Sequence, residues 1–246
     1  MRRFHPLFAI IIALLSVLAQ TPSWGDDRFK IGQIKGTQLA AFGEPILREA
    51  YRRLGHQISF HPFPSKRSLV MASDSQLDGE MLRTSRIADL YPDLIRIKVP
   101  IFNNPIYAFA LRDNIVVKSW QDLSRYKIGI LRGQLSLEKR TAAYQTRTFV
   151  NYETAFQFLH NNKIDLIIAP IYHAAGALTA EQNKAVRILK PALLSTPLFH
   201  YLAPHHYEMK AALTSELEKM RADGTIKEIL SNVLRDKDID LDIDFF

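Results

Sequence analysis

The residues of this chain that are best suited to ligand recognition are three arginines in its first half. Arg83 comes directly after the segment 77–82, and Arg86 follows three residues later. Arg67 comes after a turn at residues 64–66. A guanidinium presents a planar fork of N–H groups that matches the two oxygens of a carboxylate, so an arginine at the end of a strand could anchor an anionic ligand. The alternative for each arginine is a solvated or salt-bridged place on the surface.

An acid accompanies these arginines. Glu80 precedes Arg83 by three residues, so it could offset the charge of the arginines, meet a ligand cation or act as an acid or base. A plain acid at a strand end is an equally good interpretation. Catalytic motifs are lacking, because no His-Glu-x-x-His pair occurs, Ser136 does not stand in Gly-x-Ser-x-Gly, and the chain has no cysteine. We therefore expect binding rather than catalysis and assign no catalytic residue.

A second group of candidates lies further along the chain. Gly133 and Gln134 follow an apolar segment and precede an expected helix, where free backbone N–H groups suit an anion, although an ordinary turn would look the same. Tyr107 and Tyr172 lie near expected strand ends and could stack on a ligand or pack in the core. His173 is next to Tyr172. The ligand-binding candidates are thus Arg83, Arg86, Arg67, Glu80, Tyr107, Gly133, Gln134, Tyr172 and His173.

Metal and cofactor sites are not expected. His200, His205 and His206 match no zinc motif, and the chain offers no thiolate ligand, so the sequence favours surface histidines. Aspartates alternate with other residues over 236–244, but this stretch lacks the central glycine and the terminal glutamate of an EF-hand. An edge strand or a solvated tail is the expectation there.

These residues must be positioned by alternating strands and helices. Apolar and β-branched runs predict strands at 29–34, from 58, and at 77–82, 94–99, 106–111, 127–131, 149–150, 164–169 and 198–203. Helical spacing of apolar residues predicts helices at 44–54, 65–75, from 119, at 135–144, at 152–160 and over 206–235 with an interruption at Asp223-Gly224. This alternation predicts an α/β architecture with largely parallel sheets.

The pattern starts again after residues 112–114, and this restart predicts two lobes. We assign residues 26–111 and 197–246 to the first lobe, 112–190 to the second and 191–196 to a hinge crossover. Ligands of such α/β units bind at the loops that follow the carboxyl ends of the strands. A hinged cleft between the lobes is therefore the expected site.

Residues 1–25 have the layout of a secretory signal peptide. Arg2 and Arg3 precede an apolar run over 7–19, and small residues follow up to Gly25, where cleavage is expected. A membrane span would need about 20 apolar residues, so an uncleaved anchor is the weaker alternative. The rest of the chain has no comparable run, and the mature protein is expected to be soluble and exported.

Composition and charge limit the function further. The chain has 246 residues, of which 47% are hydrophobic and 23% charged, which excludes a disordered, collagenous or coiled-coil protein. Its net charge of +7 includes two arginines of the leader, which leaves +5 on the mature chain. Those cations are scattered, whereas a nucleic-acid-binding surface is usually concentrated in a patch, so nucleic acid is not an expected partner. The lack of cysteine removes disulfides and a lipid anchor.

Several short motifs, weak alone, carry a family resemblance through their order and spacing. They are ILREAYRRLG at 46–55, LDGEMLR at 77–83, YPDLIR at 91–96, KIGILRG at 127–133, NKIDL at 162–166 and LEKMRADGTI at 217–226. With these motifs the mature chain resembles the bacterial extracellular solute-binding proteins of the amino-acid-binding type (family 3), which are periplasmic partners of ABC importers.

The resemblance implies the fold, the location and the partners. It implies a two-lobed type II periplasmic-binding-protein fold of the Venus-flytrap kind, a periplasmic location, no cofactor and a monomer. A small-molecule solute would be the ligand, and an ABC permease or a sensor kinase would be the partner. The helix that carries Arg67 resembles part of the first-lobe site of the family. A few relatives of this fold are dehydratases that use a cleft carboxylate, so an exported enzyme with Glu80 as its acid remains the alternative.

Two departures from the family pattern bear on the ligand. Members that take α-amino acids usually carry Thr-x-x-Arg after the first-lobe strand and an acid at the end of a second-lobe strand. This chain has Arg83-Thr84-Ser85-Arg86 at a different offset, and Ala169-Pro170 where the acid would stand. The carboxylate that would bind an α-ammonium group is therefore missing, and we expect a small anionic or carboxylate-bearing solute.

Overall fold

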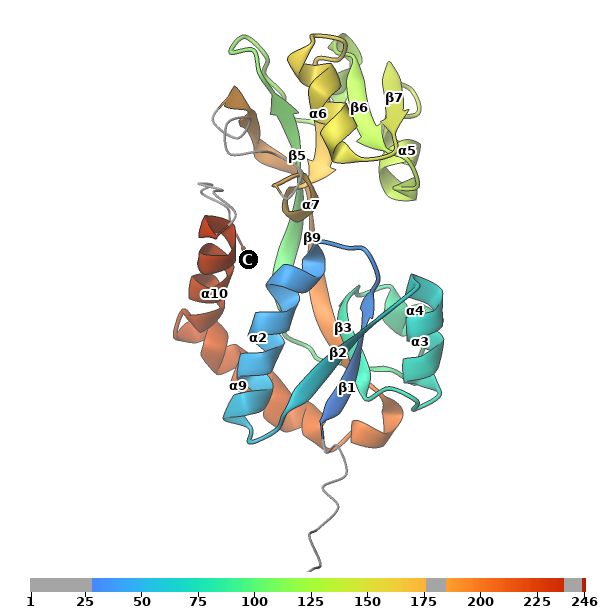
Figure 1. Ribbon diagram of the computed structural model, residues 1–246, viewed down its shortest axis with the longest axis vertical. Helices are drawn as coiled ribbons and strands as arrows, with labels where there is room; N and C mark the ends of the chain where they lie inside the picture. The colour runs from blue at the N-terminus through green and yellow to red at the C-terminus, as the bar shows by residue number, and fades with distance from the viewer. Residues whose placement is uncertain (1–27, 176–184, 237–244) are drawn as a thin grey trace, which may run out of the picture.

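Two lobes joined by two long strands make up the molecule, which is seen here in a computed structural model that describes residues 28–175, 185–236 and 245–246 (Figure 1). The joining strands are β5 (Phe102–Ala110) and β9 (Arg187–Leu202), which pair antiparallel from Phe102 opposite Leu198 to Ala110 opposite Arg187. The predicted signal peptide and most of the aspartate-rich tail lie outside the described residues.

Lobe 1 is the unit at the bottom of Figure 1. Its strands are β1 (Phe29–Ile34), β2 (Ile58–Phe63), β3 (Gly79–Thr84) and the short β4 (Ile95–Arg96). Its helices are α2 (Leu39–Arg53), α3 (Ser65–Ser73), α4 (Ile87–Leu90), η2 (Pro204–His206), α9 (Met209–Ala222) and α10 (Thr225–Arg235). β1 pairs parallel with both β2 and β3, and β3 pairs antiparallel with β9.

Lobe 2 is the upper unit. Its strands are β6 (Ile128–Leu131), β7 (Thr146–Phe149) and β8 (Leu166–Pro170), and its helices are η1 (Trp120–Arg125), α5 (Leu135–Thr141) and α6 (Tyr152–His160). β6 pairs parallel with β7 and β8, and β8 pairs antiparallel with β5. The short helix α7 (Ile171–Ala175) follows β8 and lies where the two lobes meet (Figure 1). A single path of hydrogen-bonded strands thus crosses both lobes, in the order β2-β1-β3-β9-β5-β8-β6-β7.

The core of lobe 1 explains why its longest helix forms. α2 buries Phe42, Ile46, Leu47 and Ala50, whose spacing places them on one face of a helix. This face packs against α9 and α10, and all of these residues belong to the largest hydrophobic cluster of the molecule. The helix continues through Pro45, and its apolar face begins with Leu39, so it starts five residues before the predicted residue 44.

The predicted α/β architecture with two lobes is confirmed. The predicted strand at 94–99 is reduced to the two residues of β4, because β4 lies beside the main path of the sheet and pairs only with β9. The proposed hinge residues 191–196 lie inside β9, which runs unbroken between the lobes. The limits of the lobes along the sequence stay a prediction.

None of the described helices is long and apolar enough to cross a membrane.

Candidate functional site

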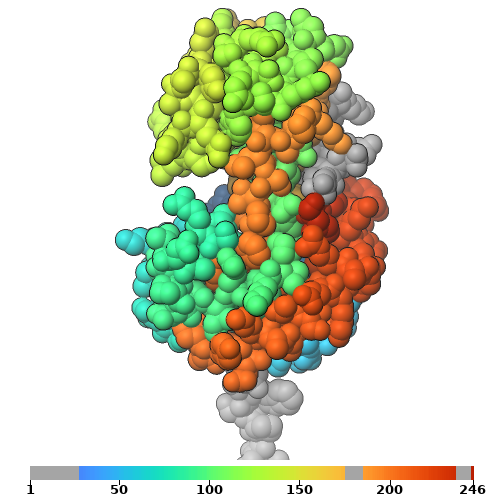
Figure 2. Space-filling model, turned by 180° about the vertical axis from the view of Figure 1, so that it is seen from behind, coloured from blue at the N-terminus to red at the C-terminus, as the bar shows by residue number. Residues whose placement is uncertain are grey.

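The carboxyl ends of the parallel strands of both lobes meet at one hollow. β1 runs toward lobe 2 and continues into a loop at the junction of the lobes (Figure 1). Helix α5, which follows β6, lies on the side of lobe 2 that faces lobe 1. Figure 2 shows the hollow between the two lobes from behind. Loops at the carboxyl ends of parallel strands are the usual place for ligands in α/β folds, and here two such edges face each other.

The charged residues at these edges are all cations. The three residues that follow each of β1, β2, β3, β6, β7 and β8 include no Asp or Glu. They include four Lys or Arg residues, which are Lys35, Lys66, Arg86 and Arg132. All four are exposed, and none makes an ion pair with another described residue. The facing edges therefore carry four cations without an ion-pair partner among the described residues.

Arg83, the predicted anchor, is buried and held by partners of its own lobe. Its side chain is 5% exposed, and its Nε donates a 2.7 Å hydrogen bond to Oε2 of Glu80, which is fully buried. Nη1 donates to Oγ of Ser65 at 2.8 Å, and Nη2 donates to the backbone carbonyl of Ser65 at 3.1 Å. Since Ser65 begins α3, the guanidinium ties β3 to the start of this helix, and most of its donors are occupied.

Glu80 belongs to the interior rather than to the rim of the hollow. Burial raises the pKa of Glu80, and the charge of Arg83 acts in the opposite direction. The carboxylate has room because residue 32 of the neighbouring strand is glycine: a Cβ there would lie 2.3 Å from Oγ of Ser68 and 2.8 Å from Oε1 of Glu80. The ion pair is thus built into the packing between β1, β3 and α3.

The junction between the lobes contains three of the predicted residues. Tyr172 is fully buried, and its ring lies 4.4 Å from Phe42 of α2 and 5.0 Å from Phe102 of β5, measured between centroids. His173 and Thr37, which follows β1, share a 3.1 Å hydrogen bond between Nε2 and Oγ1. Tyr107 of β5 is buried and interacts electrostatically with Tyr172. Helix α7 therefore links the lobe 2 strand β8 to lobe 1.

Some polar atoms at this junction have no hydrogen-bond partner among the described residues. They include Nδ1 of His173 and the hydroxyl of Tyr172, both shielded from solvent. Burial lowers the pKa of His173 and raises that of Tyr172, so both are neutral at pH 7. Buried polar atoms are costly when unpaired, which marks this place as one where a polar group of a ligand would be stabilising.

The turn at Gly133 and Gln134, predicted to bind an anion, is occupied by the side chain of Glu138 from the following helix α5. Gly133 has a φ of +86°, which glycine adopts without strain, and its N–H donates a 2.8 Å hydrogen bond to Oε1 of Glu138. Gln134 donates through Nε2 to the hydroxyl of Tyr152 at 2.8 Å. An anion at this turn would have to displace the Glu138 carboxylate.

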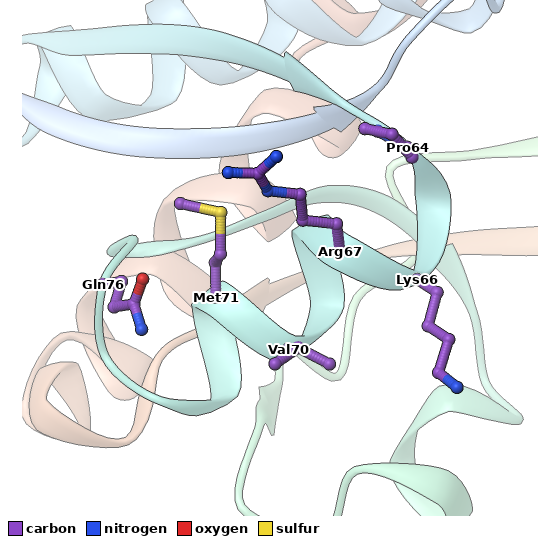
Figure 3. Close-up of a pocket in the computed structure, with 6 residues that line it drawn as sticks. All are labelled: Pro64, Lys66, Arg67, Val70, Met71 and Gln76. Carbon is purple, nitrogen blue, oxygen red and sulfur yellow. The ribbon is translucent and has the colours of Figure 1, made fainter.

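Arg67 and Arg86 are exposed, and Arg67 lines a separate depression (Figure 3). In this view Arg67 and Met71 extend to one side of α3, whereas Lys66 points away from them. The guanidinium of Arg67 lies 5.7 Å from the centroid of the Phe63 ring. The depression is open and is lined by Pro64, Lys66, Arg67, Val70, Met71 and Gln76. All of these residues belong to lobe 1, so the depression is not shared between the lobes.

The histidines do not all follow the expectation of surface residues. His200 is fully buried in β9, and its Nε2 shares a 3.0 Å hydrogen bond with the hydroxyl of Tyr51 in α2. That expectation is therefore wrong for His200, which is a core histidine. His205 is exposed and His206 half-buried, and both lie next to Asp78.

The structure thus brings the candidates together in separate groups. Arg83 and Glu80 form an ion pair inside lobe 1. Tyr107 of β5 and Tyr172 and His173 of α7 lie together at the junction of the lobes, and Gly133 and Gln134 lie in lobe 2. The sequence did not single out Ser65 and Glu138, which occupy donors of Arg83 and Gly133. The turn before α3 was a signal for Ser65, because serine often begins a helix. Nothing in the sequence pointed to the contact of Thr37 with His173, which joins residues 136 positions apart.

Solved structures share this fold at low sequence identity. The YckB protein of Bacillus subtilis matches with a TM-score of 0.69 at 15% identity, over 89% of this chain and 95% of that one. An ancestral arginine-binding protein in complex with arginine matches with 0.60 at 18%, over 84% and 97%. A histidine kinase sensor domain with similarity to periplasmic binding proteins matches with 0.62 at 13%, over 85% and 98%. The fold is that of the two-lobed periplasmic binding proteins.

Sequence comparisons add one relative. An uncharacterised protein of Shewanella oneidensis is 27% identical over 191 residues, which span 74% of this chain and 72% of that protein. No model of a known protein family matches the sequence.

Proposed function

We propose that this protein is an exported, periplasmic receptor that captures a small solute between its two lobes. Support comes from the fold, which it shares with solute-binding proteins, and from the two strand edges that face one hollow. The unpaired Nδ1 of His173 and the hydroxyl of Tyr172 would meet polar atoms of the solute at the junction. In this proposal the leader at residues 1–25 directs export.

The solute would be anionic, and the four cations at the facing edges are the observation that carries this step. Lys35, Lys66 and Arg86 follow strand ends of lobe 1, and Arg132 follows a strand end of lobe 2. A cationic solute would meet like charges there, and Glu138, the acid at the lobe 2 turn, already accepts a hydrogen bond from the N–H of Gly133. The missing acid at Ala169-Pro170 agrees with this preference, and so the arginine found in one structural neighbour is not the ligand we expect here.

Arg83 has a positioning role in this proposal. Its charge is compensated by Glu80, and its hydrogen bonds fix the start of α3, next to Lys66. The exposed Arg86 and Arg132 would instead contact the solute. Guanidinium groups pair with carboxylates through two parallel hydrogen bonds, and each such contact contributes about 1.5–3 kcal/mol when it is shielded from water.

A thermal-shift screen tests the proposal. Protein that lacks residues 1–25 is heated with single members of a panel of monocarboxylates, dicarboxylates, aromatic acids, phosphate esters, amino acids and polyamines. A solute at a hundredfold excess over its Kd raises the free energy of unfolding by about 2.7 kcal/mol. We expect a shift with an anionic member and none with the polyamines. A shift confined to polyamines would overturn the assignment of charge.

Matched variants locate the site. Arg86→Ala and Arg132→Ala should each weaken binding of the active solute by about tenfold or more, because each removes one charge-assisted contact. Arg235→Ala removes an equally exposed arginine at the end of α10 and should leave the Kd unchanged. If the three variants behave alike, the solute binds elsewhere.

The receptor would pass its solute to an ABC permease or report it to a sensor kinase. The two partners are separated by growth of a deletion strain on the identified solute: loss of uptake supports import, and intact uptake with a lost transcriptional response supports sensing.

The exported enzyme is the less favoured alternative. It depended on Glu80 as an exposed acid or base, but this carboxylate is fully buried and engages Arg83. A general acid or base must lie within hydrogen-bond reach of its substrate. Turnover of the bound solute that is abolished by Glu80→Gln in a folded protein would restore this alternative.

A further inference from the structure

Three metal-ligating side chains converge at the end of lobe 1 that is remote from lobe 2. Asp78 lies in the turn before β3, and His205 and His206 lie in η2, which follows β9. One potential ligand atom from each of the three lies within 4.8 Å of the others. This end carries the amino ends of β1 and β3, so the cluster is on the opposite edge of the sheet from the solute hollow (Figure 1).

The geometry of the cluster suits a small divalent ion. Oδ1 of Asp78 lies 3.0 Å from Nε2 of His205 and 2.6 Å from Nε2 of His206. Zinc binds imidazole nitrogen and carboxylate oxygen at about 2.0–2.2 Å, which in a tetrahedral site sets the ligand atoms about 3.3 Å apart. Both distances from Oδ1 of Asp78 to the imidazole nitrogens are thus within about 0.7 Å of this spacing.

The backbone holds the carboxylate in place without using the oxygen that faces the histidines. Oδ2 of Asp78 accepts a 2.6 Å hydrogen bond from the N–H of Lys30, and the backbone N–H of Asp78 donates to the carbonyl of Lys30 at 2.8 Å. The N–H of Ala203 donates to the carbonyl of Asp78 at 2.9 Å, which connects the turn to the segment that carries the histidines. Hydrogen bonds of this kind orient metal ligands.

The imidazoles are also held in position. The ring of His206 lies 4.6 Å from that of Phe29, and the rings of His205 and His206 lie 4.0 Å apart, measured between centroids. Two neutral imidazoles and one carboxylate form a donor set with a charge of −1. That set matches a divalent cation, and the exposure of His205 leaves room for water as a further ligand.

We propose that Asp78, His205 and His206 form a binding site for a divalent transition-metal ion of the zinc type, separate from the solute site. Nitrogen and carboxylate donors without thiolate suit Zn²⁺ and its late first-row neighbours rather than Ca²⁺ or Mg²⁺. The bound ion would fasten η2 to the turn before β3 and so stabilise lobe 1.

Titration of the protein with Zn²⁺ tests the site. Protein that lacks residues 1–25 and carries no histidine tag is stripped with chelator and titrated with ZnCl₂ in a calorimeter. We expect one Zn²⁺ per chain and a higher unfolding temperature in its presence. Failure to saturate at millimolar Zn²⁺ would overturn the proposal.

Variants show whether these residues bind the ion. The double variant His205→Gln/His206→Gln should weaken Zn²⁺ binding by about tenfold or more, and its circular dichroism should stay unchanged because His205 is exposed and His206 only half-buried. His61→Gln, which removes a histidine of β2, is the matched control and should bind like the wild type. Wild-type affinity in the double variant would overturn the proposal.

A second measurement reports on the ligands themselves. Co²⁺ in place of Zn²⁺ should give the visible absorption bands of a low-symmetry nitrogen and oxygen site in the wild type, and Asp78→Asn should change them. Identical spectra in both proteins would show that the carboxylate is not a ligand. Neither result depends on whether a solute binds between the lobes.

Discussion

At the scale of single residues, the most informative finding is that Arg83 is paired within its own lobe. An arginine at a strand end was a reasonable anchor for a ligand, but the same strand supplies Glu80 three residues earlier, and a bulge in the pairing with β9 falls between the two. Sequence alone could not distinguish a free guanidinium from a paired one. The burial of both side chains is a property of the packing of α3 on the sheet, which no local pattern encodes.

The buried pair gives a prediction about stability. Arg83→Met leaves the Glu80 carboxylate buried without its partner, which should lower the free energy of unfolding by about 3–5 kcal/mol. The double variant Arg83→Met/Glu80→Gln leaves no unpaired charge and should lose less than the single variant. Urea denaturation of the wild type, both single variants and the double variant measures the coupling. Additive losses would mean that the two side chains do not stabilise each other.

At the scale of elements, His200 and Tyr51 connect β9 to α2, and this contact predicts a pH dependence. Burial lowers the pKa of His200 from its ordinary 6.5 to about 4, so the folded protein keeps it neutral. Between these values the unfolded chain binds more protons than the folded one, and stability falls as the pH decreases through this window. The loss attributable to His200 is about 2–3 kcal/mol between pH 7.5 and 4.5.

Urea denaturation at pH 7.5 and pH 4.5 measures this effect in the wild type and in His200→Gln. The variant is expected to be less stable at pH 7.5 but to lose less on acidification, because its amide does not titrate. Equal losses in the two proteins would assign the acid sensitivity to other groups.

Most elements could be predicted from the sequence because their patterns are local. β1 matches its predicted range of 29–34, α6 matches 152–160, and the interruption at Asp223-Gly224 separates α9 from α10. Residues 187–197 of β9 were missed because Pro191 and Pro197 argue against a strand. It forms nonetheless, since it pairs with β5 along the connection between the lobes and its register shifts near Pro191.

The site was less predictable than the elements. Strand ends can be read from periodicity, and for this reason the sequence could place Arg86 shortly after a strand. Which donors are already occupied depends on residues far apart in sequence, such as Ser65 with Arg83 or Thr37 with His173. The cluster of Asp78 with two histidines was missed for the same reason, as 127 residues separate Asp78 from His205.

At the scale of the whole molecule, the two lobes are connected by β5, β9 and the contacts of α7, and a hollow lies between their facing edges. Like charges on both edges oppose closure, and an anionic solute that contacts both would remove this opposition. To shift a protein from 1% to 99% closed, a solute must favour the closed state by about 5.5 kcal/mol, which two or three charge-assisted contacts can supply.

Closure should be visible by energy transfer between dyes on the two lobes. The chain has no cysteine, so Asp89→Cys in α4 and Lys139→Cys in α5 would be the only labelling sites. The active solute of the thermal-shift panel is expected to increase the transfer efficiency with the same Kd as the thermal shift. A control pair within lobe 1, Asp89→Cys with Glu208→Cys, should not respond. A saturating solute that leaves the distance between the lobes unchanged would show that binding occurs without closure, and the role of the opposing cations would then be limited to affinity.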